Sequence, residues 1–215
     1  MKGLLVKEKY SIWNSCKAFL IIPVFFYTIM VVGAVLHKHD IEGFPVGMVF
    51  MMMGLMPATI VNQEMMSRWH VNVLTMPYTR EQIVSAKYIA SLIINAVTAV
   101  VTAIVVGVCI AFGNIEGSGA ALMAKLIFGG IGMGLLPAVV FLPTNFKFYD
   151  TVGGARVMVS SLVGGLIGGS NIVIMESIGR GHSILGGGFI FMCLMIVLFV
   201  ISWWLSIIFF RKKDV

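Results

Sequence analysis

The residues that could bind a metal ion gather in a short polar stretch between two apolar runs. His37 and His39 lie there, with Asp40 and Glu42 close behind. Imidazole and carboxylate groups are zinc ligands, but a zinc site needs three or four ligands at fixed spacing. A polar loop between two membrane spans has the same composition without a metal. We therefore expect no metal site in this chain.

Catalytic motifs are missing from the sequence. It contains no H-E-x-x-H, no G-x-S-x-G and no close pair of carboxylates. No Asp or Glu falls inside an apolar run, which also argues against a proton-coupled transporter, because proton relays need an ionisable group within the membrane. Cys16, Cys109 and Cys193 show no C-x-x-C spacing. We expect no enzymatic activity and no cofactor on this chain.

Glycines cluster in two apolar runs, but not at the spacing of nucleotide-binding loops. A P-loop requires G-x-x-x-x-G-K-[ST] between a strand and a helix. Spacings such as Ser160/Gly164/Gly168 instead let two helix backbones approach closely in a membrane. We predict helix packing here, with a dimer or gating surface on the later run as the alternative. The glycines are Gly129, Gly130, Gly132 and Gly134, then Gly164, Gly165, Gly168 and Gly169.

The elements that must position these residues are membrane spans. Hydrophobic types make up 59% of the 215 residues and charged types only 11%, whereas a soluble domain carries about 25% charged residues. A span needs about 20 apolar residues, so several fit in the chain. We predict an all-α, polytopic membrane protein with six transmembrane helices in a single domain, 1–215. The spans are 18–36, 44–61, 89–112, 126–142, 157–175 and 184–210.

Lysine and arginine lie mainly on one side of the predicted membrane. With the N-terminus in the cytoplasm, 12 of the 15 cations fall on the inner side, and Lys38, Lys125 and Arg180 fall on the outer side. This asymmetry predicts that both termini are cytoplasmic. The net charge of +6 therefore reflects membrane orientation, and we expect the lipid bilayer, not nucleic acid, as the partner.

The segment 1–17 precedes the first span. Leu5, Ile12 and Cys16 share one helical face, and Lys7 and Asn14 lie on the opposite one. This pattern is typical of an interfacial amphipathic helix on the inner leaflet, which we predict. A solvated basic segment leading into the span is the alternative.

The loop 62–88 is the longest predicted cytoplasmic loop. Pro77 is expected to end a first helical segment, and Thr79 with Gln82 forms a capping box that starts a second. The second helix runs directly into the span 89–112. Force applied at 79–87 would therefore be transmitted to that span. A static loop with the same pattern is the alternative.

The loop contains an acidic residue, a Trp, and then Leu-x-x-Pro-x-x-Arg-x-x-Ile-Val-x-x-Lys-Tyr. The residues of this pattern are Glu64, Trp69, Leu74, Pro77, Arg80, Ile83, Val84, Lys87 and Tyr88. The chain opens with Met-Lys-Gly-Leu-Leu-x-Lys-Glu. In both features it resembles the permease subunits of type-2 ABC exporters, in the short class with six spans and no fused ATPase.

The resemblance implies that this loop bears the coupling helix for a separate cytosolic ABC ATPase. It also implies two ATPase copies and a second permease, as a homodimer or a heterodimer, in the bacterial plasma membrane. ATP and Mg²⁺ would be bound by the ATPase, not by this chain. The family has an acidic pair where this sequence has Gln63-Glu64. The expected coupling residues are Glu64, Trp69, Leu74, Pro77, Thr79, Arg80, Glu81 and Lys87.

The resemblance also suggests a class of cargo. Members with short outer loops include exporters of phenol-soluble modulins and bacteriocin-like peptides, so we expect an amphipathic or hydrophobic cargo, such as a peptide toxin or antimicrobial peptide, exported by alternating access. Such a cargo partitions into the bilayer before capture. A drug or lipid exporter and a non-transporting immunity or sensor protein that binds a toxin are the alternatives. The sequence does not identify substrate-binding residues.

Overall fold

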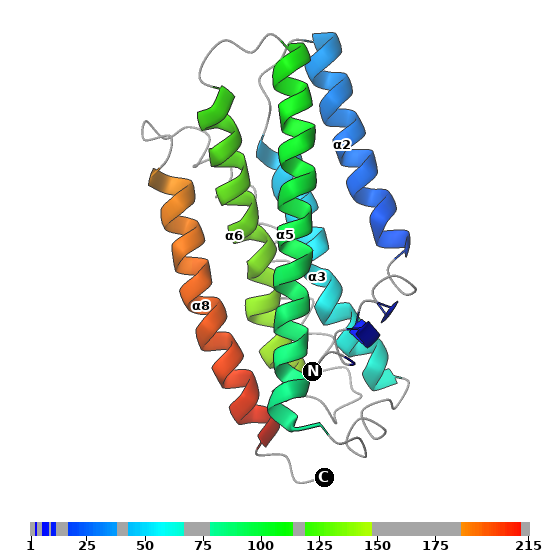
Figure 1. Ribbon diagram of the computed structural model, residues 1–215, viewed down its shortest axis with the longest axis vertical. Coiled ribbons are helices and arrows are strands. Elements are labelled where there is room, and N and C mark those ends of the chain that lie inside the picture. The colour runs from blue at the N-terminus through cyan, green and yellow to red at the C-terminus, as the bar shows by residue number, and fades with distance from the viewer. Residues whose placement is uncertain are drawn as a thin grey trace.

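A computed structural model describes residues 3, 6–8, 10–11, 17–37, 43–66, 78–113, 119–147 and 186–211. All regular structure within these ranges is helical, which confirms the prediction of an all-α chain there. The long helices are α2 (Lys17–His37), α3 (Gly43–Met66), α5 (Arg80–Gly113), α6 (Gly119–Lys147) and α8 (Gly186–Arg211). They run up and down a single elongated bundle (Figure 1).

Four of these helices are long and apolar enough to cross a membrane. Their candidate spans are Pro45–Glu64, Arg80–Phe112, Leu122–Lys147 and Phe189–Arg211. They correspond to four of the six predicted spans. The first predicted span lies in α2, where Ile21–Gly33 forms a shorter apolar helix. The predicted span 157–175, with Gly164, Gly165, Gly168 and Gly169, lies outside the described residues.

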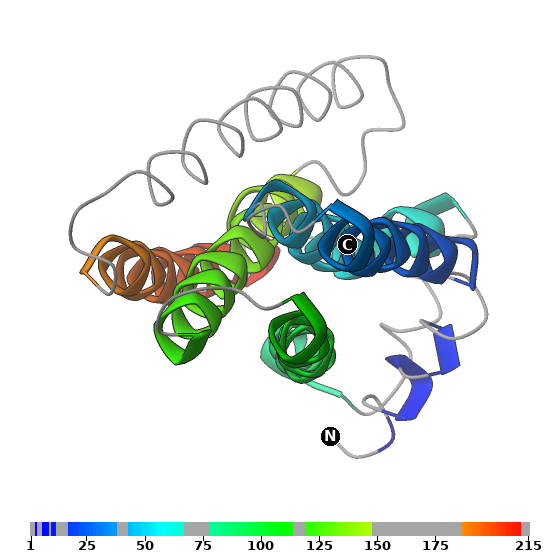
Figure 2. The same ribbon diagram turned by 90° about the horizontal axis from the view of Figure 1, so that it is seen from above.

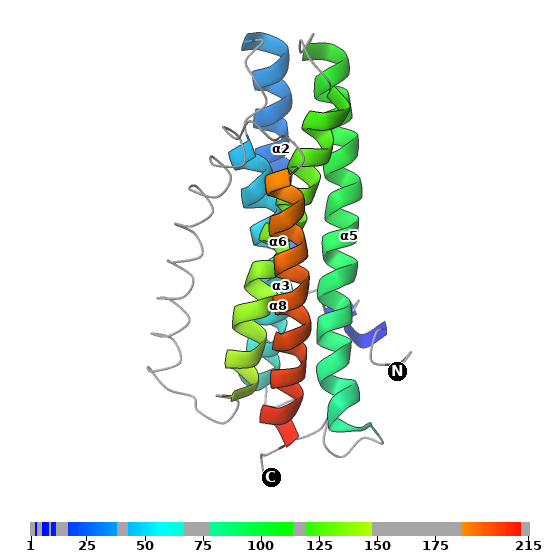
Figure 3. The same cartoon turned by 90° about the vertical axis from the view of Figure 1, so that its left-hand side faces the viewer.

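The helices α3 and α6 form the centre of the bundle. Their candidate spans are 56% and 61% buried, against 28% for both α5 and α8. Large apolar side chains of α5 and α8 point away from the protein, as expected for a surface in contact with lipid chains. The views from above and from the side show α5 and α8 at the outside of this central pair (Figures 2 and 3).

Close backbone packing joins α3 to α6. A Cβ atom added at Gly54 would lie 2.1 Å from the carbonyl oxygen of Gly134, a distance that real Cβ atoms do not show. A Cβ at Gly134 would lie 1.9 Å from the side-chain oxygen of Asn95 in α5. The predicted packing role of the glycines in 126–142 is therefore confirmed at Gly134, where three helices meet.

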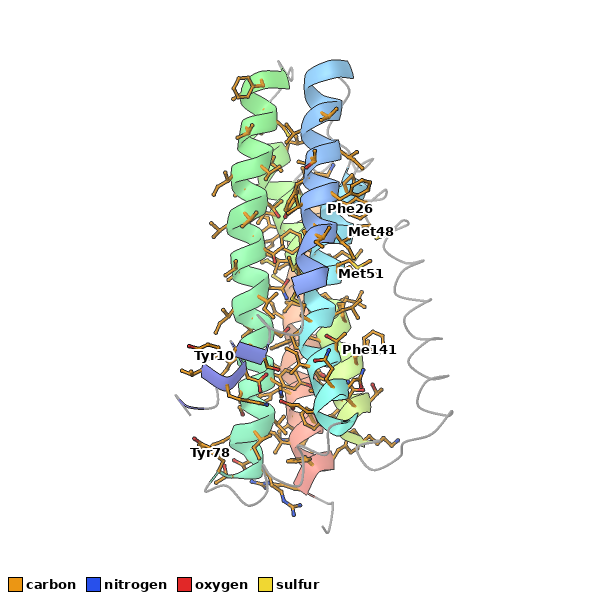
Figure 4. The ribbon with its side chains drawn as sticks, turned by 90° about the vertical axis from the view of Figure 1, so that its right-hand side faces the viewer. Tyr10, Phe26, Met48, Met51, Tyr78 and Phe141 are labelled. Carbon is orange, nitrogen blue, oxygen red and sulfur yellow. The ribbon has the colours of Figure 1, made fainter. Side chains whose placement is uncertain are left out.

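One end of the bundle collects most of the described charged residues, and we call it the basal end. There α5 begins at Arg80, α6 ends at Lys147 and α8 ends at Arg211. The side-chain view places Tyr10 and Tyr78 toward this end, whereas Phe26, Met48 and Met51 lie farther along the bundle (Figure 4). The described positions 6–8 and 10–11 are helical, and Glu8 is buried while Tyr10 is exposed. Leu5, Ile12 and Cys16, which define the predicted interfacial face, lie outside the described residues.

Candidate functional site at the basal end

The first turn of α5 is closed by the predicted capping box. The backbone N–H of Gln82 lies 3.3 Å from the hydroxyl oxygen of Thr79, and the backbone N–H of Thr79 donates to the Gln82 side chain over 3.2 Å. These bonds satisfy backbone donors that have no partner inside the helix. The helix then continues without interruption to Gly113. The segment 80–87 is thus one rigid element with the span that follows it, as predicted.

Two lysines and two glutamates form a buried charge cluster beside this segment. The ammonium group of Lys87 donates to Glu8 over 2.6 Å and to Glu64 over 2.8 Å. Lys7 pairs with Glu8 over 3.3 Å and also with Glu64. The side chains of Lys87 and Glu8 are each 3% exposed. The cluster joins the N-terminal segment, the end of α3 and the start of α5.

The charges of the cluster balance, which is what permits its burial. An isolated buried charge is costly, whereas two cations and two carboxylates within hydrogen-bonding distance neutralise one another. Glu64 lies in the last turn of α3, where the helix dipole disfavours a carboxylate, so it depends on the two lysines. The pKa of Lys7 is lowered to about 8, mainly by burial and secondly by the nearby positive charge of Lys87.

Arg80 and Glu81 connect α5 to the last turn of α8. The guanidinium of Arg80 donates to the carbonyl oxygens of Phe210 and Arg211 over 3.2 and 3.3 Å. These carbonyls have no partner inside a helix that ends there, and a cation near them also complements the helix dipole. Glu81 forms an ion pair with the side chain of Arg211. The arginine that the sequence predicts as a coupling residue therefore caps another helix.

Further polar contacts continue along the same two helices. The hydroxyl of Tyr88 is hydrogen-bonded to Ser202 over 2.8 Å and to Ser206 over 2.7 Å. The indole N–H of Trp203 donates to the Ser85 hydroxyl over 3.1 Å. The hydroxyl of Ser202 also donates to the carbonyl of Val139 in α6. Buried hydrogen bonds of this kind are strong where water cannot compete.

Within the membrane, α5 carries a buried polar stripe. Thr98 and Thr102 donate to carbonyl oxygens of their own helix, as does the amide of Asn95. The hydroxyls of Thr102 and Tyr27 lie 2.6 Å apart, which joins α5 to α2. Thr102 is therefore a point of hydrogen bonding between two helices.

The structure brings together five of the eight predicted coupling residues, namely Glu64, Thr79, Arg80, Glu81 and Lys87. Trp69, Leu74 and Pro77 lie outside the described residues. Lys87 is buried within the chain, so it would act by holding the segment in place.

Four residues of the site, Lys7, Glu8, Ser202 and Ser206, were not among the predicted coupling residues. Two signals were present: Lys7 and Glu8 end the opening motif, and two serines four positions apart mark one face of an apolar helix.

The chemistry available at the basal end is ionic and hydrogen-bonding. Among the described residues no group of three or more His, Cys, Asp or Glu side chains could hold a metal ion. In the cluster each ammonium group is paired with carboxylate oxygens. The second carboxylate oxygen of Glu8 is buried and has no hydrogen-bond partner. Such an arrangement can hold helices together and transmit movement between them.

Comparison with known proteins assigns the chain to a family. No curated protein and no solved structure matches it. Residues 3–211 match the family model described as ABC-2 family transporter protein. The match covers nearly the whole chain, including every helix described above. The chain therefore belongs to the ABC-2 family of transporter proteins, as a multi-pass membrane permease of an ABC exporter.

Proposed function

We propose that this permease is driven at its basal end by a separate cytosolic ABC ATPase. The observation that carries the proposal is the fixed position of the segment 80–88. Its side chains contact the N-terminal segment, α3 and α8 through the charge cluster and the hydrogen bonds described above. A force on this segment would therefore reach several spans at once.

The charge distribution supports a cytoplasmic position for this end. Lys7, Arg80, Lys87, Lys147 and Arg211 all lie there, and positive residues accumulate on the cytoplasmic side of membrane proteins. ATP and Mg²⁺ would be bound by two copies of the ATPase, and two permeases, as a homodimer, would enclose the transport path in a bacterial plasma membrane. ATP-driven closure of the ATPases would tilt the spans and open that path outward.

The cargo proposed here is an amphipathic or hydrophobic molecule, with a peptide toxin or antimicrobial peptide as the first candidate. The outer helices present apolar side chains such as Ile104, Val197 and Trp204 to the membrane. No carboxylate occurs in the described spans between Leu92 and Phe112 or between Leu122 and Thr144. These features suit a cargo that is already dissolved in the bilayer.

The experiment is purification of the tagged permease from its own host membrane, followed by assay of vanadate-sensitive ATP hydrolysis. We expect a P-loop ATPase in stoichiometric amount. The charge-reversed double variant R80E/E81R should lower ATP hydrolysis in the complex, because both contacts with α8 change. The variant K147E is the matched control: it changes an exposed basal cation on α6 that lies over the Phe209 ring, and it leaves the contacts of Arg80 and Glu81 in place. Absence of the ATPase, or equal activity of R80E/E81R and K147E, would contradict the proposal.

A further inference from the structure

The contacts between α5 and α8 follow a regular antiparallel order. Arg80 reaches Phe210 and Arg211, Ser85 reaches Trp203, and Tyr88 reaches Ser202 and Ser206. The rings of Tyr88 and Phe199 also meet, with their centroids 5.1 Å apart. All of these contacts fall within 80–88 and 199–211. We call this pair of segments the basal junction.

The helix α8 packs against α6 at both ends: within 199–211 Ser202 donates to Val139 and the ring of Phe210 lies 5.5 Å from that of Phe146, and α6 remains its neighbour away from the basal junction. The rings of Phe128 and Phe189 lie 5.9 Å apart near the opposite end of the bundle. A Cβ atom at Gly132 would lie 2.5 Å from the ring of Phe191, so α8 approaches α6 closely there as well. Figure 1 shows α5 and α8 meeting at the lower end and diverging upward, and Figure 2 shows the same divergence from above.

We propose that the basal junction makes α8 a second helix that moves with the coupling segment, and that Arg80 and Tyr88 are its positioning residues. This inference rests on the proposed function for the source of the movement. Arg80 binds the end of α8 through two backbone carbonyls, so it fixes the position of the helix backbone. A single ion pair between exposed side chains is too weak to fix the backbone in this way. Tyr88 holds α8 one to two turns farther in, at a buried site. Two fixed points along an axis determine the direction of the helix as well as its position.

The first test needs no ATPase. Spin labels are placed at L92C, one turn beyond the basal junction, and at W204C, an exposed position within it. The chain is otherwise cysteine-free and is diluted with unlabelled permease, so that only distances within one chain are measured. The double variant R80Q/Y88F should broaden this distance distribution, because the hydrogen bonds of both fixed points are lost. The matched control is Y27F, which removes a tyrosine hydroxyl that bonds Thr102 in α5 and not α8. A distance distribution in R80Q/Y88F that is as narrow as in the control would contradict the positioning role of Arg80 and Tyr88.

The second test uses the complex with its ATPase. A reducible thiol crosslinker of matched length joins E81C to R211C, across the existing ion pair. If the two segments move together, crosslinked and reduced samples should hydrolyse ATP within about twofold of one another, since no required motion is blocked. If crosslinking lowers the rate of ATP hydrolysis about tenfold and reduction restores it, the two segments must separate during the cycle, and the inference is wrong. Failure of the uncrosslinked chain to bind an ATPase would instead contradict the proposed function, and the first test would still decide the junction.

Discussion

Lys87 and Glu8 lie 79 positions apart in the sequence, yet the ammonium group of Lys87 donates to the Glu8 carboxylate over 2.6 Å in a buried site. This contact fixes the N-terminal segment against the start of α5. A second contact supports it, because a Cβ atom at Gly3 would lie 2.9 Å from the hydroxyl of Tyr78, directly before α5. The N-terminal segment is therefore part of the structure that surrounds the coupling segment.

The first prediction concerns the balance of charges in the cluster. E8Q should destabilise the chain by about 3 kcal/mol, because it leaves the buried Lys87 ammonium without full compensation. The double variant E8Q/K87M should lose less than the sum of the single variants, since Lys7 and Glu64 can still pair. Thermal unfolding of the purified chain measures these free energies. Additive losses would show that the two residues do not interact.

The second prediction concerns the contact between α3 and α6. G54A should destabilise strongly, by about 3 kcal/mol, because the new methyl group meets the backbone of Gly134, which cannot rotate away. G107A is the matched control, since a Cβ there would find only the end of Met123 at 3.9 Å. That substitution should be neutral or stabilising by up to about 1 kcal/mol, because alanine favours helix more than glycine does. Equal stability of the two variants would contradict the close packing.

The third prediction concerns pH. Burial lowers the pKa of Lys7 from 10.5 to about 8, so between these two values the unfolded chain binds more protons than the folded chain. The free energy of unfolding should therefore rise as the pH increases from 8 to 10.5. Below pH 8 the lysine is protonated in both states and contributes no further change. Comparison of wild type with K7M by thermal unfolding at pH 7 and pH 9.5 should show a smaller rise in K7M; an identical rise would assign the effect to other groups.

The fourth prediction concerns the capping box of α5. T79A should cost about 1 kcal/mol by removing the hydroxyl that faces the N–H of Gln82. It should also reduce ATP hydrolysis in the complex, because the coupling segment then frays at its first turn. T79S keeps the hydroxyl and should retain both properties. If T79A lowers the stability but leaves ATP hydrolysis unchanged, the capping box has no role in coupling.

Local patterns in the sequence predicted most of the helices and the start of α5. Long apolar runs can satisfy their backbone in a membrane only as helices, and Thr79 with Gln82 signals a cap through short-range spacing. The order of the helices in space was not predictable in the same way. Polar residues in the spans are few, and among the four candidate spans the two most apolar, in α5 and α8, are the least buried. Lipid and protein interiors are similarly apolar, so apolar character alone does not distinguish the two faces.

The candidate site was predictable only in part for a related reason. Glu64, Arg80 and Lys87 stand out as charged residues beside spans. Their partners are distant in sequence, and the partners of Arg80 are backbone carbonyls, which leave no mark in the residue types. Ser202 and Ser206 are visible as a polar pair on one helix face, but only the fold shows that Tyr88 lies opposite.

The contact of Gly54 with the Gly134 carbonyl restricts how the bundle can rearrange. At this contact the two helix backbones meet directly, and no side chain can change rotamer to make room. Rotation or sliding of one helix against the other would therefore cause a steric clash. During a transport cycle α3 and α6 would then move as one unit, with their relative position unchanged. Labels on α3 and α6 should keep their separation in every nucleotide state.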